Sequence, residues 1–86
     1  MFYVYILNNR KVGKLYIGYT SDLRRRLKEH NAGRVHTTRV FGKDVELIYY
    51  EAYKDKQDAE DREKSFKKSG SVYNGLVKRI KRSRGL

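Results

Sequence analysis

Two tyrosines near the start of the chain, Tyr5 and Tyr16, lie in apolar segments that predict neighbouring β-strands. A polar stretch separates the two segments and is typical of a hairpin connection. A hairpin that is symmetric about Arg10 and Lys11 places Tyr5 directly opposite Tyr16 on one face of the sheet. We therefore expect two phenol groups, which can donate or accept a proton, to share one patch of that face.

A cation and an imidazole follow, one helical turn apart. Arg26 and His30 fall on the same face of a predicted helix as the apolar residues Leu23 and Leu27. An arginine directed at a sheet is costly unless it meets a negative charge, and a phosphate group of a substrate supplies one. The alternative is that Arg26 lies at the edge of the apolar stripe and extends into water.

A carboxylate occupies a similar position in a second predicted helix, over residues 56–69. Ala59 and Phe66 define a thin apolar stripe, and Glu63 lies between them on that face. A hard divalent ion such as magnesium is held by one carboxylate together with water and substrate phosphate oxygens, so Glu63 is a candidate metal ligand. Glu60 is the nearest competitor for this role. In so basic a chain the alternative is that Glu63 simply pairs with a nearby lysine or arginine.

This ordered set of residues resembles the GIY-YIG nuclease family. The residues that carry the resemblance are Val-Tyr-Ile at 4–6, Tyr-Ile-Gly at 16–18, Arg26, His30 and Glu63. The likeness is strongest to small stand-alone bacterial members and covers most of the chain. One position departs from the pattern, because Val4 stands where the first motif of the family has its glycine.

The resemblance implies a metal-dependent endonuclease that hydrolyses DNA phosphodiester bonds with little sequence specificity, in DNA repair or processing. By analogy, Tyr5, assisted by Tyr16 or by a metal-bound water, helps to orient and deprotonate the attacking water. This role requires a nearby cation, because an unperturbed phenol has a pKa of about 10. Arg26 is expected to stabilise charge on the phosphate, and Glu63 to hold one Mg²⁺ or Mn²⁺ ion. His30 acts as a general acid, or it hydrogen-bonds Tyr5 or the phosphate.

The elements that must position these residues form one α/β domain over residues 1–86. We expect a three-stranded sheet flanked by helices, in the order β-β-α-β-α-α, with both opening strands buried on both faces. Strands are predicted over 2–7, 15–19 and 45–53, and helices from Ser21 or Asp22 to Asn31, over 56–69, and from about Ser71 onward.

The charge of the chain favours a polyanionic partner. Lys and Arg total 21 against 10 acidic residues, a formal net charge of +11. DNA phosphates are the expected partner, and the residues expected to contact them are Arg25, Arg34, Arg39, Lys78, Arg79, Lys81 and Arg82. The alternative for the last four is a solvated helix end. No long apolar segment suggests a membrane partner, and the chain has no cysteine and no visible secretory signal, which fits a cytoplasmic protein.

Two other functions remain open. A catalytically weak or inactive nucleic-acid-binding module would use the same basic surface without cleavage. An RNA-binding or ribosome-associated protein is the other, which the charge permits, although no RNA-recognition signature is visible. Asn74 is a candidate for an asparagine that many GIY-YIG members carry after the glutamate helix, and an additional protein partner for targeting is left open.

Overall fold

The computed structural model describes residues 1–11, 13–35 and 45–85, which form three strands and three helices in the predicted order. The elements are β1 (Phe2–Asn9), β2 (Leu15–Thr20), α1 (Leu23–Asn31), β3 (Val45–Tyr53), α3 (Lys56–Lys68) and α4 (Gly70–Arg79). The predicted α/β class and element order are therefore confirmed.

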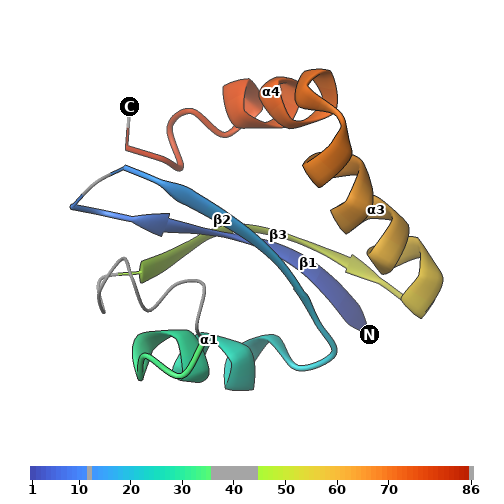
Figure 1. Cartoon of the computed structure of the whole chain (residues 1–86), viewed down its shortest axis with the longest axis horizontal. Coiled ribbons are helices and arrows are strands. Elements are labelled where there is room, and N and C mark those ends of the chain that lie inside the picture. Colours follow the sequence, from blue (N-terminus) through green and yellow to red (C-terminus); the bar gives the residue numbers. More distant parts are fainter. Residues whose placement is uncertain (12, 36–44, 86) are drawn as a thin grey trace.

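The sheet has the strand order β2-β1-β3, and β1 pairs antiparallel with both neighbours. Helix α1 covers one face, while α3 and α4 lie together over the other (Figure 1). The central strand is therefore buried on both faces, as predicted. Strand β2 is at an edge, where only Gly18 and Thr20 are buried, so the prediction of burial on both faces is wrong for β2.

Alternation along β1 sends its side chains into two separate layers. Val4 and Ile6 are fully buried in the core beneath α3 and α4, with Ala59, Phe66, Leu76 and Ile80. The intervening residue, Tyr5, points to the opposite face, which α1 covers. This face carries the two tyrosines, Arg26 and His30 of the candidate site, whereas Glu63 belongs to α3, which lies over the other face (Figure 1).

The hairpin register differs from the one that a symmetric turn predicts. Tyr5 pairs with Gly18, and Tyr16 pairs with Leu7. The connection is closed between Asn9 and Lys14, where the Asn9 amide donates to the Lys14 carbonyl at 2.9 Å, and Gly13 takes a left-handed φ of 68°. A shift of two residues preserves the face of every side chain, so Tyr5 and Tyr16 still lie on one face, as diagonal rather than direct neighbours.

The helix ends follow their capping residues. The Asp22 side chain accepts from the Arg25 amide at 3.1 Å, and Gly33 follows the last turn of α1 with a φ of 72°. Ser69 separates α3 from α4 and caps the start of α4 through the Val72 amide. None of the helices in the described ranges is long and apolar enough to span a membrane.

Candidate active site

Three rings from three different elements meet beneath α1. The Tyr5 hydroxyl and Nε2 of His30 are 2.8 Å apart, and both residues are fully buried. The half-buried ring of Tyr16 lies 6.3 Å from that of Tyr5 and 5.1 Å from that of His30. The structure therefore brings together the two phenols and the imidazole that the sequence singled out.

Gly18 makes room for the Tyr5 phenol. A Cβ at this position would overlap Cζ and the hydroxyl oxygen of Tyr5. The phenol therefore lies across the edge strand, directly over its cross-strand partner. Sequence reasoning quoted Gly18 as part of a motif but gave it no role. The signal that could have revealed one is a glycine inside an otherwise apolar strand, which often marks a close approach.

Arg26 joins the cluster from the rim. Its guanidinium lies near the Tyr5 hydroxyl, where it acts to lower the pKa of that phenol, and it also lies 3.4 Å from the Glu29 carboxylate, with 36% of its side chain exposed. Burial lowers the pKa of Arg26, but the hydrogen bonds and charges of Tyr5 and Glu29 raise it above the ordinary value, so the group stays a cation. Tyr5, Tyr16, Arg26 and His30 are called the Tyr5 cluster below.

Burial keeps both hydrogen-bonded members of the cluster neutral. It raises the pKa of Tyr5 to about 12, outweighing the hydrogen bond from Arg26. Arg26 is thus the nearby cation that the resemblance requires, yet it does not bring the phenolate within reach of neutral pH. Burial, followed by the charge of Arg26, lowers the pKa of His30 to about 4. A neutral His30 is a poor general acid at pH 7, and its hydrogen bond to Tyr5 is the role that the geometry favours.

Glu63 stands within electrostatic reach of this cluster, because its charge contributes to raising the pKa of Tyr5. Its side chain is 22% exposed and lies 3.4 Å from Nζ of Lys67. Glu60 pairs with Lys56 at 3.8 Å. Among the residues that the structure describes, no three acidic, histidine or cysteine side chains gather to hold a metal. A single carboxylate fits Mg²⁺, which keeps several waters and takes phosphate oxygens from a substrate.

A second polar network, which sequence reasoning missed, fixes α3 on β3. The Glu51 carboxylate accepts from the hydroxyls of Tyr49 and Tyr53 and from Nε and Nη2 of Arg62, at 2.9 and 3.1 Å. Arg62 also lies over the Phe66 ring, 4.2 Å from its centroid. Burial raises the pKa of Glu51, but these hydrogen bonds lower it by a larger amount. The net pKa lies below the ordinary value, so the carboxylate remains ionised. The available signal was a lone acid flanked by tyrosines two residues away on each side, on one face of a strand.

The basic residues expected to bind phosphate divide into two places. Arg25 and Arg34 are exposed on and just after α1. The other described residues line an open cavity of about 420 Å³, which we call the C-terminal basic cavity. Its lining residues are Lys78, Arg79, Lys81, Arg82 and Ser83. Arg39 lies outside the described residues. Asn74 is exposed on α4.

The chain belongs to the GIY-YIG family of nuclease domains, because the family model of the GIY-YIG catalytic domain matches residues 1–75. A UPF0213 protein of Streptococcus pneumoniae is 41% identical over 66 residues, which cover 77% of this chain and 66% of the relative. UPF0213 proteins of Streptococcus pyogenes serotypes M5 and M3 are each 44% identical over 54 residues, 63% of this chain and 59% of each relative. The match thus spans slightly less than two thirds of these relatives. No solved structure gives a significant match.

Proposed function

We propose that this protein is a metal-dependent endonuclease that hydrolyses DNA phosphodiester bonds with little sequence preference, in DNA repair or processing. The observation that carries the proposal is the buried hydrogen bond between the Tyr5 hydroxyl and His30, beside the cation of Arg26, which acts to lower the pKa of the same phenol. A packing role for the tyrosine would not need a cation and an imidazole beside one hydroxyl. The absence of cysteine suits a reducing compartment, and we place the activity in the cytoplasm.

The cluster supports a division of labour among its members. Tyr16, the half-buried phenol, orients the attacking water together with Tyr5. The water proton passes to the Tyr5 oxygen while the Tyr5 proton passes to Nε2 of His30. The water oxygen forms a bond to phosphorus as the bond to the leaving oxygen breaks, and Arg26 stabilises the charge on the nonbridging oxygens.

Glu63 is the residue that would hold a magnesium or manganese ion. When bound, the ion neutralises phosphate charge and stabilises the leaving oxygen. Lys67 forms an ion pair with the Glu63 carboxylate at 3.4 Å. Because 54% of the Lys67 side chain is exposed, it can leave this ion pair for solvent at little cost in free energy.

Low sequence preference follows from the kind of contact that this surface offers. Arg25, Arg34 and the C-terminal basic cavity present exposed cations, which suit phosphate oxygens. Phosphate contacts fix position and orientation but carry no base information. We therefore expect the protein to bind DNA mainly through the phosphate backbone, rather than through a defined base sequence.

The states of two candidate residues favour a second function, that of a catalytically weak nucleic-acid-binding module. Tyr5 is fully buried with a pKa raised to about 12, and Glu63 pairs with Lys67, which leaves both groups in states unsuited to immediate chemistry. In that case the basic surface would bind DNA without cutting it.

Cleavage assays with two glutamate variants separate these candidates. Supercoiled plasmid and branched, flapped and single-stranded oligonucleotides would be incubated with Mg²⁺ or Mn²⁺. We expect the wild type to cut and Glu63→Ala to lose cleavage while its DNA affinity changes by less than about 2-fold, because the loss of one metal ligand removes no direct interaction with a phosphate. Glu60→Ala is the matched control, since Glu60 is also paired with a lysine on α3.

Equal cleavage by wild type and Glu63→Ala would refute the metal assignment. Binding without cleavage on every substrate would instead favour the binding module.

A further inference from the structure

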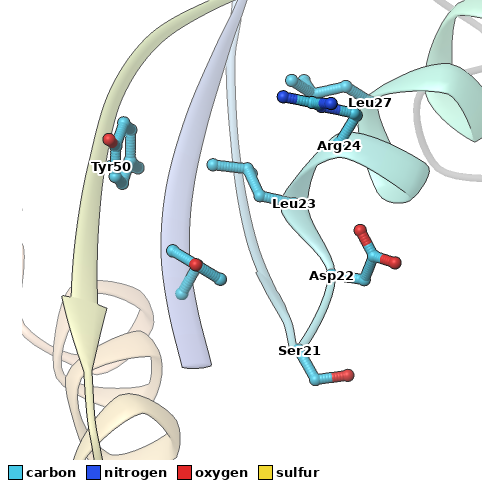
Figure 2. Close-up of a pocket in the computed structure, with 7 residues that line it drawn as sticks. Ser21, Asp22, Leu23, Arg24, Leu27 and Tyr50 are labelled. Carbon is cyan, nitrogen blue, oxygen red and sulfur yellow. The ribbon is translucent and has the colours of Figure 1, made fainter. Parts of the chain in front are cut away.

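A pocket of about 430 Å³ opens between α1 and the sheet, on the face that carries Tyr5 (Figure 2). Its wall combines two tyrosines from the sheet, two leucines from α1 and polar groups at the start of that helix. The lining residues are Tyr3, Tyr50, Leu23, Leu27, Arg24, Ser21 and Asp22. We call it the Tyr3–Tyr50 pocket.

The aromatic wall of this pocket is open to a ligand. Tyr50 is 52% exposed, although it lies in the middle of a strand. Tyr3 contacts its ring at 5.9 Å and 66°, an edge-to-face arrangement that holds the Tyr50 ring in place. The preceding tyrosine, Tyr49, is occupied on the other face by its hydrogen bond to Glu51. A fixed, half-exposed ring opposite apolar side chains is a platform on which a flat aromatic group can stack.

The pocket and the Tyr5 cluster lie on opposite flanks of α1. Tyr50 is the cross-strand partner of Tyr5 on β3, whereas the Tyr5 phenol extends over β2. Leu27 and Arg26 are consecutive on the helix and so point about 100° apart, one toward each flank. Two strand spacings separate the outer strands, about 10 Å, which neighbouring nucleotides of one DNA strand can bridge.

Positive charge at the rim of the pocket favours a ligand that carries phosphate groups. Arg24 lines the pocket, in a chain of net charge +11. Asp22 also lines the pocket, but its carboxylate points away from Tyr50 and caps α1 by accepting from the Arg25 amide (Figure 2). An unpaired nucleotide combines a flat aromatic base with a flanking phosphate. A base inside an intact duplex does not, because its faces are covered by its stacked neighbours.

We propose that the Tyr3–Tyr50 pocket binds an unpaired nucleobase of the substrate strand. The inference rests on the proposed function for the identity of the substrate as DNA, and it narrows that substrate to DNA with an unpaired segment near the cut, such as a flap, a loop or a branch.

Binding to single-stranded and duplex DNA of equal length tests the pocket. Affinities would be measured by fluorescence anisotropy with a chelator present, so that no cleavage occurs. We expect Tyr50→Ala to lower the ratio of single-strand to duplex affinity by about 5-fold or more, the effect of removing one base-stacking ring. Tyr50→Phe is the matched control and should keep the ratio within about 2-fold, because it retains the ring. Tyr50 is half exposed, so thermal unfolding should show both variants folded.

A 2-aminopurine base in the single strand provides a second measurement. Its fluorescence should fall on binding to the wild type and to Tyr50→Phe, but not to Tyr50→Ala. An unchanged affinity ratio in Tyr50→Ala, or equal weakening on both DNA forms, would overturn the pocket. That result is separable from failure of the proposed function, since absent cleavage by the wild type would refute the endonuclease without affecting the affinity ratio.

Discussion

Burial holds both Tyr5 and His30 in their neutral forms. With the pKa of Tyr5 raised to about 12 and that of His30 lowered to about 4, neither group is charged at pH 7. The Tyr5 hydroxyl and Nε2 of His30 are hydrogen-bonded, and the cation of Arg26 acts to lower the pKa of the same phenol. At the scale of single residues, the site is therefore a buried, neutral phenol–imidazole pair with one cation at its rim.

His30 should make the protein less stable as the pH falls from about 6.5 to about 4. An unfolded histidine has a pKa of about 6.5. Between these two values the unfolded state binds a proton that the folded state does not. The free energy of unfolding therefore falls with pH, by at most about 1.4 kcal/mol per pH unit, and the contribution of His30 is fully present only above pH 6.5.

Urea unfolding at a series of pH values, with wild type and His30→Gln, would measure this slope. The variant should lose the His30 contribution, while the titration of the carboxylates persists in both proteins. A nuclear magnetic resonance titration of the His30 ring should give a midpoint near 4, and a midpoint near 6.5 would contradict the neutral cluster.

The candidate residues could be identified from sequence, but their protonation states could not. The order and spacing of Tyr5, Tyr16, Arg26, His30 and Glu63 select them as candidates through the resemblance to the GIY-YIG family. The pKa of Tyr5 depends instead on how completely α1 covers it, which no spacing reveals. Glu51 was not predicted as part of a network, because the cation that it binds, Arg62, lies on another element. The sequence pattern alone does not pair a carboxylate on a strand with an arginine on a helix, 11 residues later.

At the scale of elements, the boundaries of strands and helices could be predicted closely, but the hairpin register could not. Alternating apolar residues and capping side chains place each element within one or two residues. The register depends on the conformation of the turn, where Gly13 adopts a positive φ and moves the closing pair to Asn9 and Lys14. That shift puts Gly18, rather than Tyr16, opposite Tyr5.

Gly18→Ala should therefore damage the site through β2. The added methyl group overlaps the end of the Tyr5 side chain, so the phenol must move away from His30 and Arg26. We expect a loss of about 1–3 kcal/mol in the free energy of unfolding. Cleavage should fall on the order of 100-fold, because displacing a catalytic group by about 1 Å has that effect.

Gly75→Ala is the matched control, because a Cβ at this exposed position on α4 meets nothing within 4 Å. It should preserve cleavage and stabilise the protein by up to about 1 kcal/mol. Thermal unfolding and plasmid nicking of both variants provide the measurements. If Gly18→Ala retained wild-type cleavage, the Tyr5 hydroxyl would not need its position over β2.

At the scale of the whole molecule, exposed cations occur on both sides of the sheet. Arg25 lies on α1, whereas the C-terminal basic cavity lies at the C-terminal end of α4, over the opposite face (Figure 1). Under the proposed function, a DNA backbone held at the Tyr5 cluster needs additional contacts to keep its orientation, and this cavity gathers four cations that could supply them.

Neutralising this cavity should reduce the salt dependence of DNA binding. We expect Lys78→Gln combined with Lys81→Gln to reduce the magnitude of the slope of log K against log salt by about 0.9 for each duplex phosphate that the variant no longer neutralises. The matched control combines Lys54→Gln with Lys56→Gln, which removes equal charge from exposed positions before and at the start of α3. Anisotropy titrations at several salt concentrations measure the slope, and equal slopes in the two double variants would exclude the cavity from the DNA-binding surface.

The network around Glu51 fixes the rotation of α3 about its own axis, and therefore the direction of the Glu63 side chain. Arg62 and Glu63 are consecutive, so they leave the helix about 100° apart, and two hydrogen bonds to Glu51 hold the first of them. A helix tethered in this way cannot turn about its axis without breaking those bonds, and the direction of Glu63 follows from the tether. In a genetic screen for loss of DNA cleavage, we expect substitutions at Glu51 to be recovered beside those at Glu63, although Glu51 contacts only other protein groups.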